Sequence, residues 1–90
     1  MAEKTKVKRQ VLERDGSRCR YCGRPVARWP EFAQAPPGTG YLNFDHVVPK
    51  SRGGGYTVEN IVVSCADCNA EKYDRTPEEW REAGLTVKEA

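Results

Sequence analysis

The hydrophobic positions near the N-terminus recur at helical spacing. Within residues 5–14 the apolar side chains fall on one face of a helix, and basic residues occupy the other faces. The apolar residues of that face are Val7, Val11 and Leu12. Thr5 is a candidate N-cap and Asp15-Gly16 a candidate end of the helix, whereas residues 1–4 are expected to be loose.

The pattern in the middle of the chain is typical of strands. Residues 41–48 are rich in aromatic and β-branched side chains and alternate weakly, and residues 61–64 form a short apolar run. The buried side of the first strand is expected to hold Leu42, Phe44 and either Val47 or Val48. A glycine-rich hairpin loop, 53–55, separates the strands, and a helix is expected from Cys65 to about Tyr73. This order of strand, loop, strand and helix predicts a small α+β fold.

The segment between the N-terminal helix and the first strand is the hardest to interpret. Prolines and glycines exclude a regular helix through residues 27–40, so we expect a loop with one short turn near residues 30–33. Trp29 and Phe32 lie in this loop. A satellite cluster on the small core is favoured for these rings over base stacking, because aromatic residues in small domains are mostly core residues.

The last predicted element is a short C-terminal helix. Residues Thr76 to Glu79 form a capping box with proline at the first helical position. The helix should cover about residues 77–83, end at Gly84 and be anchored to the body by Trp80. Residues 85–90 are expected to form a frayed tail.

Four cysteines could supply the additional stabilisation that a chain of this size needs. A chain of 90 residues buries little surface and usually needs disulfides or a metal. Two Cys-x-x-Cys pairs, Cys19/Cys22 and Cys65/Cys68, are the usual half-sites of a tetrahedral Zn²⁺ ion, and Gly23 can adopt the positive φ of such a turn. Tyr21 between the first two ligands could cover the site or lie outside it.

Disulfides and a redox-active Cys-x-x-Cys motif are the alternatives to zinc. The N-terminus has basic residues but no apolar run of a signal peptide, and no stretch is apolar enough to cross a membrane. We therefore expect a cytoplasmic protein, not bound to a membrane, whose thiols stay reduced and bind structural Zn²⁺.

Positive charge is concentrated in the first third of the chain. Residues 1–28 hold nine Lys or Arg against three Asp or Glu, whereas the chain as a whole has a formal charge of +2. This basic third fits contact with a phosphate backbone, and it equally fits a solvated charged helix. Composition leaves the two interpretations open.

The only histidine and the polar residues of the same region are of the types that hydrolytic enzymes use. His46 is the only histidine, and imidazole can take a proton from water near neutral pH. Asp45 offers a hard oxygen ligand of the kind that Mg²⁺ or Mn²⁺ prefers. Asn69 and Lys72 are three positions apart and share a helix face, where the amide oxygen could bind a metal and the ammonium a phosphate.

These features together resemble the HNH endonuclease family, in the subgroup with a four-cysteine zinc site. The resemblance covers about residues 9–75 and rests on a glycine-rich run and several motif residues. The motifs are Asp45-His46-x-x-Pro49, Asn60 and Cys65-x-x-Cys68-Asn69-x-x-Lys72. The resemblance implies a ββα-metal fold, related to the treble clef, in a single HNH nuclease domain over residues 1–90. A divalent catalytic ion would lie between the first strand and the helix.

The resemblance also implies roles for individual residues. His46 would be the general base, Asp45 and Asn69 the ligands of a catalytic Mg²⁺, Mn²⁺ or Ni²⁺ ion, and Asn60 the residue that fixes the loop and orients the histidine. Many family members have histidine where this chain has Asn69, so we expect looser metal binding and less use of soft metals. The expected nucleic-acid contacts are Lys50, Arg52 and Lys72.

Two functions from different classes remain. The first is a metal-dependent, largely sequence-nonspecific DNA endonuclease or nickase, and the second is a non-catalytic zinc module that binds nucleic acid or protein. The combination of Asp45, His46, Asn60 and Asn69 favours the first. Small stand-alone nucleases of this type resemble those encoded by phage and mobile elements, so a packaging protein or another larger partner is one expectation. A restriction role is also compatible, and the oligomeric state is open.

Overall fold

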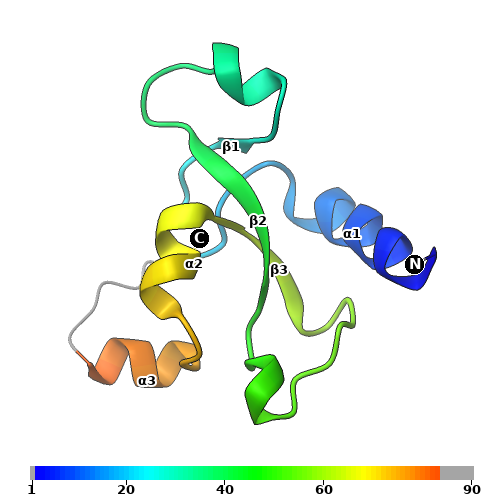
Figure 1. Ribbon diagram of the computed structural model, residues 1–90, viewed down its shortest axis with the longest axis vertical. Coiled ribbons are helices and arrows are strands. Elements are labelled where there is room, and N and C mark those ends of the chain that lie inside the picture. Colours follow the sequence, from blue (N-terminus) through cyan, green and yellow to red (C-terminus); the bar gives the residue numbers. More distant parts are fainter. Residues whose placement is uncertain (1, 84–90) are drawn as a thin grey trace.

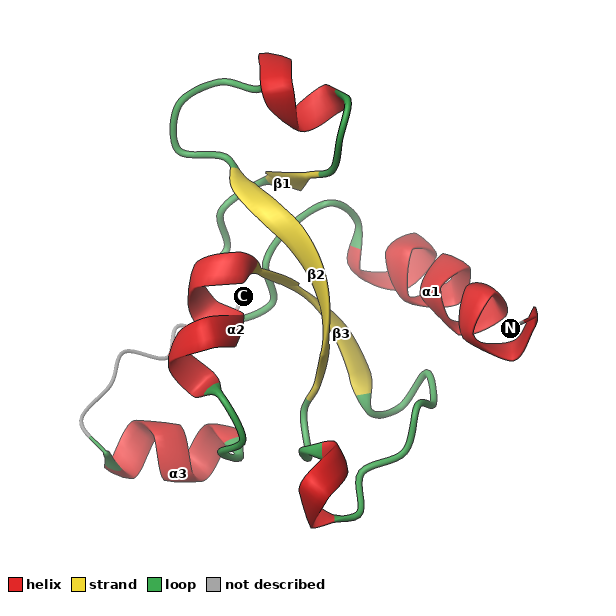
Figure 2. Ribbon diagram, in the orientation of Figure 1, coloured by secondary structure: helices red, strands yellow, loops and turns green. Residues whose placement is uncertain are grey.

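The computed structural model describes residues 2–83 as a three-stranded sheet flanked by helices (Figures 1 and 2). The helices are α1 (Ala2–Asp15), α2 (Ala66–Lys72) and α3 (Pro77–Glu82), and the strands are β1 (Val26–Ala27), β2 (Gly40–His46) and β3 (Ile61–Cys65). Two short 3-10 helices are η1 (Glu31–Gln34) and η2 (Lys50–Arg52). The predicted small α+β fold and its order of strand, loop, strand and helix are confirmed.

The sheet has the order β1-β2-β3 and centres on the antiparallel pair β2–β3. Its ladder joins Leu42 to Cys65 at one end and His46 to Ile61 at the other. Every residue of β3 is buried, because α1 packs against β3 and α2 packs against β2 and β3. The two helices lie on opposite sides of the β2–β3 pair (Figure 1). This arrangement brings the end of β2 close to α2.

Helix α1 is longer than the sequence predicted. It begins at Ala2, so the predicted N-cap at Thr5 and the loose segment before it are wrong over residues 2–4. Alanine, glutamate and lysine are strong helix formers. The negative charge of Glu3 in the first turn is also favourable at the positive end of the helix dipole. The predicted end is confirmed, since Gly16 follows the helix with φ +69°. The predicted apolar face is also confirmed, with Val11 fully buried.

The C-terminal end of α1 is fixed to the sheet by polar contacts. Arg14 donates hydrogen bonds to the backbone oxygens of Val58 (2.6 Å) and Ile61 (2.7 Å). The carboxylate of Asp15 accepts hydrogen bonds from Arg14 and, at 3.3 Å, from the backbone N–H of Val63. These contacts position the whole of α1 beside β3.

The aromatic cluster in the loop differs from the prediction. The short turn near residues 30–33 is present as η1, but the side chain of Trp29 is 65% exposed and therefore is not core material. Trp29 meets Phe32 edge to face at 6.2 Å between ring centroids, and Phe32 meets Tyr41 at 5.1 Å. The loop that contains η1 extends away from the helices at the N-terminal end of β2 (Figure 1).

Helix α3 begins with the predicted capping box. The Thr76 hydroxyl accepts a hydrogen bond from the Glu79 N–H, and the Glu79 carboxylate accepts one from the Thr76 N–H. Trp80 is fully buried, stacks edge to face on Tyr21 and donates from Nε1 to the Glu71 carboxylate at 2.9 Å. The predicted anchor is confirmed, whereas the predicted end at Gly84 and the tail lie outside the described residues. Over residues 2–83 no helix combines the length and the apolar character needed to cross a bilayer.

Candidate active site and metal centre

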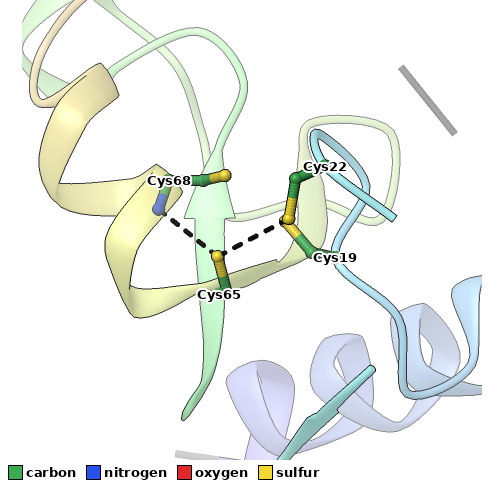
Figure 3. A group of neighbouring side chains, drawn as sticks. All are labelled: Cys19, Cys22, Cys65 and Cys68. Atoms are coloured by element: carbon green, nitrogen blue, oxygen red, sulfur yellow. Dashed lines mark hydrogen bonds between the residues drawn. The ribbon is translucent and has the colours of Figure 1, made fainter. Parts of the chain in front are cut away.

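The four cysteines converge at one point although they come from distant parts of the chain. The first pair lies in the turn after α1, and the second pair spans the end of β3 and the first turn of α2 (Figure 3). Their sulfur atoms all lie within 4.8 Å of one another, and the Sγ atoms of Cys22 and Cys65 are 3.9 Å apart. Zinc–sulfur bonds of 2.3 Å imply sulfur–sulfur distances of about 3.8 Å in a tetrahedron. The cluster therefore has the size that a Cys₄ metal site requires.

Local backbone geometry forms the first half of this site. The backbone N–H of Gly23 donates to the Cys19 carbonyl oxygen at 2.9 Å, and Gly23 has φ +79°. This left-handed conformation favours glycine, as the sequence predicted. In the second half, Cys65 caps α2, and its sulfur accepts a hydrogen bond from the Cys68 N–H at 3.4 Å.

The electrostatics of the cluster fit a bound cation. Burial raises the pKa of the Cys22 thiol, but hydrogen bonds from the Arg24 backbone and the other cysteines outweigh burial and bring this pKa to about 7. Burial raises the pKa of the Cys65 and Cys68 thiols. The four sulfurs all become thiolates only if a positive ion compensates their charge, and a divalent ion such as Zn²⁺ does so. All four cysteines are free, so the structure contains no disulfide bond between them.

A second group of candidate site residues lies at the end of β2. A hollow of about 330 Å³, here called the β2 hollow, opens between β2, η2 and α2. Its lining consists of Phe44, Asp45, His46, Pro49, Lys50, Ser51, Asn69, Tyr73 and Asp74. The structure thus brings together four of the predicted site residues, Asp45, His46, Lys50 and Asn69. The β2 hollow does not include Asn60, Arg52 or Lys72.

Asp45 is held by two buried partners. Its side chain is almost fully buried, and Oδ2 accepts a hydrogen bond from the Tyr21 hydroxyl at 2.6 Å. The ammonium nitrogen of Lys72 lies 3.2 Å from the same oxygen. Burial and the neighbouring Asp45 carboxylate raise the pKa of Tyr21, so its hydroxyl stays protonated and donates. Both contacts use Oδ2, while the residue also lines the β2 hollow.

Lys72 therefore has a different position from the predicted one. Its side chain is 0% exposed, and Nζ donates to the backbone oxygen of His46 at 2.8 Å. A buried ammonium paired with Asp45 cannot reach a phosphate at the surface, so the predicted phosphate contact is not supported. Instead, Lys72 connects α2 to both residues of the Asp45-His46 motif.

His46 stands at the last position of β2, where the strand ends and its ring reaches the β2 hollow. The ring meets Tyr56 edge to face at 5.4 Å between centroids. Burial lowers the pKa of His46, the cations Lys50, Lys72 and Lys4 lower it further, and only Asp45 opposes them. The neutral imidazole, which is the form that can accept a proton, is therefore favoured.

Asn60 fixes the loop that follows β2. Its Oδ1 accepts a hydrogen bond from the Val48 N–H at 2.9 Å, and its Nδ2 donates to the carbonyl oxygens of Val48 (3.1 Å) and Gly55 (3.0 Å). A Cβ atom at Gly54 would collide with the Val48 carbonyl oxygen, so the loop also needs a glycine there. The backbone oxygen of Asn60 accepts from the Val47 N–H at 2.8 Å. Asn60 thus acts on the backbone next to His46.

The two remaining predicted nucleic-acid contacts, Lys50 and Arg52, differ in their surroundings. Lys50 lines the β2 hollow, whereas the Arg52 guanidinium forms a bidentate pair with the Glu79 carboxylate at 2.8 and 2.9 Å. A phosphate at Arg52 would have to displace Glu79. Tyr73 and Asp74, which line the hollow just after α2, were not among the predicted site residues. Tyr73 is 76% exposed and has φ +54°, a strained value for a tyrosine that no sequence pattern indicated.

Comparisons with known proteins identify the family of this chain. A model of the HNH endonuclease family matches residues 19–75, which include both cysteine pairs and the whole lining of the β2 hollow. The chain is also similar to the type IV methyl-directed restriction enzyme EcoKMcrA of Escherichia coli strain K12, with 34% identity over 65 residues. That match covers 72% of this chain and 22% of the enzyme, so the chain spans a minor part of the relative it matches. The chain therefore belongs to the HNH endonuclease family.

Proposed function

We propose that the chain is a divalent-metal-dependent DNA endonuclease whose general base is His46. The observation that carries this proposal is that Asp45, His46 and Asn69, which come from a strand and a helix, line one hollow. Membership of the HNH endonuclease family supports the reaction class. The methyl-directed recognition in the name of EcoKMcrA is not carried over, because the match covers 22% of that enzyme.

The reaction is hydrolysis of a phosphodiester bond. Neutral His46 takes a proton from a water molecule, the water oxygen forms a bond to phosphorus, and the bond from phosphorus to one sugar oxygen breaks, after which that oxygen takes up a proton from solvent water. Asp45 and Asn69 would hold a divalent ion such as Mg²⁺ or Mn²⁺, which supplies charge neutralisation at the phosphoryl oxygens and the departing oxygen. The lowered pKa of His46 keeps the base in its neutral form near neutral pH.

The other motif residues position these groups. Tyr21 and Lys72 fix the Oδ2 atom of Asp45, and Lys72 also binds the backbone of His46. Asn60 holds the loop after β2 through the backbone of Val48 and Gly55. The Cys₄ site would bind Zn²⁺ and act structurally, because a closed four-thiolate site has no open position for substrate.

A second candidate is a zinc-stabilised module that binds nucleic acid or protein without cutting. The presence of an amide at Asn69 favours it, because imidazole is the stronger ligand for several divalent metals. Plasmid nicking separates the two functions. Purified, zinc-loaded protein is incubated with supercoiled plasmid and with Mg²⁺, Mn²⁺ or Ni²⁺ in turn. Nicking that requires one of these ions supports the nuclease, and absence of nicking with every ion supports the module.

A further inference from the structure

Helix α1 carries two lysines directly beside the β2 hollow. Lys4 Nζ lies 5.3 Å above the centroid of the Tyr56 ring, and that ring meets His46 edge to face. Lys8 Nζ lies 5.6 Å above the ring of Phe44, which itself lines the β2 hollow. The spacing of four residues places both ammonium groups on one side of α1.

Two further hollows extend the β2 hollow along α1. One, of about 200 Å³, is lined by Lys4 and Tyr56 and shares His46 and Lys50 with the β2 hollow. The other, of about 500 Å³, lies between α1 and β2 and shares Phe44 with the β2 hollow. Because the β2 hollow shares lining residues with each of the other two, the combined lining of the three hollows is here called the α1 track. Its cations are Lys4, Lys8, Arg9, Arg28 and Lys50.

The charge of the α1 track is available for a ligand. Over residues 2–83, the ion pairs of the structure use other cations, namely Arg14, Arg20, Arg24, Arg52 and Lys72. The track also contains the acidic residues Glu13 and Asp74, and Asp45 is paired with Lys72. The α1 track therefore has five cations and only two acidic side chains that form no ion pair within the described residues. A polyanion that passes His46 fits this surface.

We propose that the α1 track binds the phosphates of a DNA duplex on both sides of the bond that is cut. This proposal rests on the proposed nuclease function and names where the substrate lies. Helix α1 has 14 residues and is about 21 Å long, which corresponds to about six phosphates of one strand. Lys4 and Lys50 hold the phosphates on one side of His46, and Lys8, Arg9 and Arg28 hold those on the other. Of the two interpretations of the basic N-terminal third, this placement selects the phosphate contact.

The test measures DNA binding separately from cutting. In a His46→Ala background and without added divalent metal, fluorescence anisotropy gives the affinity for a labelled 20-base-pair duplex between about 50 and 200 mM salt, a range over which phosphate contacts change affinity strongly. Removing both Lys4 and Lys8 by substitution with alanine should lower the salt slope by about 2, so that the parent loses about tenfold more affinity over this range than the variant. The matched control is Lys6→Ala, which removes one exposed charge from the opposite side of the same helix.

The outcomes separate the two proposals. A slope that falls by about 1 for each of Lys4→Ala and Lys8→Ala, and stays at the value of the His46→Ala protein for Lys6→Ala, supports the α1 track even if the unsubstituted protein does not cut plasmid. Slopes that are the same in all three variants would overturn the track, whether or not the unsubstituted protein nicks plasmid. Circular dichroism and zinc content confirm that each variant is folded, so a lost slope cannot come from unfolding.

Discussion

The hydroxyl of Tyr21 donates a 2.6 Å hydrogen bond to Oδ2 of Asp45. Tyr21 lies between two cysteines of the metal centre, and Asp45 lines the β2 hollow. One side chain thus connects the Cys₄ cluster to the carboxylate that we propose as a ligand of the catalytic ion. Through Tyr21, the Cys₄ cluster would therefore position the proposed active site as well as stabilise the fold.

Replacing Tyr21 with phenylalanine should weaken binding of the proposed catalytic ion without unfolding the domain. The phenyl ring keeps the edge-to-face contact with Trp80, but Asp45 loses a donor and becomes less well oriented. Loss of such a supporting hydrogen bond typically weakens metal affinity about tenfold or more. The Mn²⁺ concentration that gives half-maximal nicking should rise accordingly. Tyr41→Phe is the matched control, because Tyr41 does not line the β2 hollow and its ring packs on Phe32. An unchanged Mn²⁺ requirement in Tyr21→Phe would contradict this role.

Replacing Cys65 with serine should remove zinc and unfold the domain. Cys65 contributes one of the four sulfurs, is fully buried and caps α2 through the Cys68 N–H. Zinc binding contributes directly to folding in small domains, so the variant should lose bound metal, helical circular dichroism and nicking together. A folded Cys65→Ser protein that still cut plasmid at the parental rate would show that the cluster is not structural.

Replacing Lys72 with methionine should destabilise the native state. The substitution leaves the Asp45 carboxylate buried without its cationic partner, and breaking a buried pair from one side costs about 3 kcal/mol. Denaturant unfolding at fixed zinc concentration measures the change, with the exposed Lys6→Met as the control. Adding Asp45→Asn should recover part of the loss, because it removes the unpaired charge. A Lys72→Met protein as stable as Lys6→Met would mean that the pair contributes nothing.

Local patterns in the sequence predicted much of the fold and part of the site. The Asp45-His46 motif, the two cysteine pairs and the capping box at Thr76 each follow from residue spacing within a few positions. The strand of residues 61–64 and the following helix were equally predictable, because apolar runs and helix starts are local signals. The structure adds that the two cysteine pairs meet in one cluster and that the Asp45-His46 motif lines one hollow with Asn69.

The rest depends on contacts between distant segments. Tyr21 could have pointed toward or away from the cysteines, and only the packing against Trp80 and Asp45 determines its direction. Lys72 is on the predicted face of α2, yet that face is covered by β2, so a residue expected at the surface is buried. The prediction for Trp29 was wrong in the opposite direction, because this residue was expected to pack on the core and is exposed. Helical and strand periodicity carries no information about such coverage.

Replacing Asn69 with histidine should tighten binding of softer metals. Asn69 lines the β2 hollow opposite Asp45 and His46, and imidazole suits Ni²⁺ better than an amide oxygen does. The Ni²⁺ concentration for half-maximal nicking should fall severalfold, whereas Asn69→Ala should raise it. If both substitutions leave the Ni²⁺ and Mn²⁺ requirements at parental values, Asn69 is not a ligand.

The most direct test of the account is the rate of plasmid nicking by His46→Ala, measured beside the parent in the same divalent metal. A general base contributes at least about 100-fold to the rate, so the variant should be slower by that factor or more while its zinc content and thermal unfolding stay parental. Gln34→Ala, an exposed substitution on η1, is the control for handling and purity. A folded, zinc-loaded His46→Ala protein that nicks at the parental rate would contradict the assignment of His46 as the base.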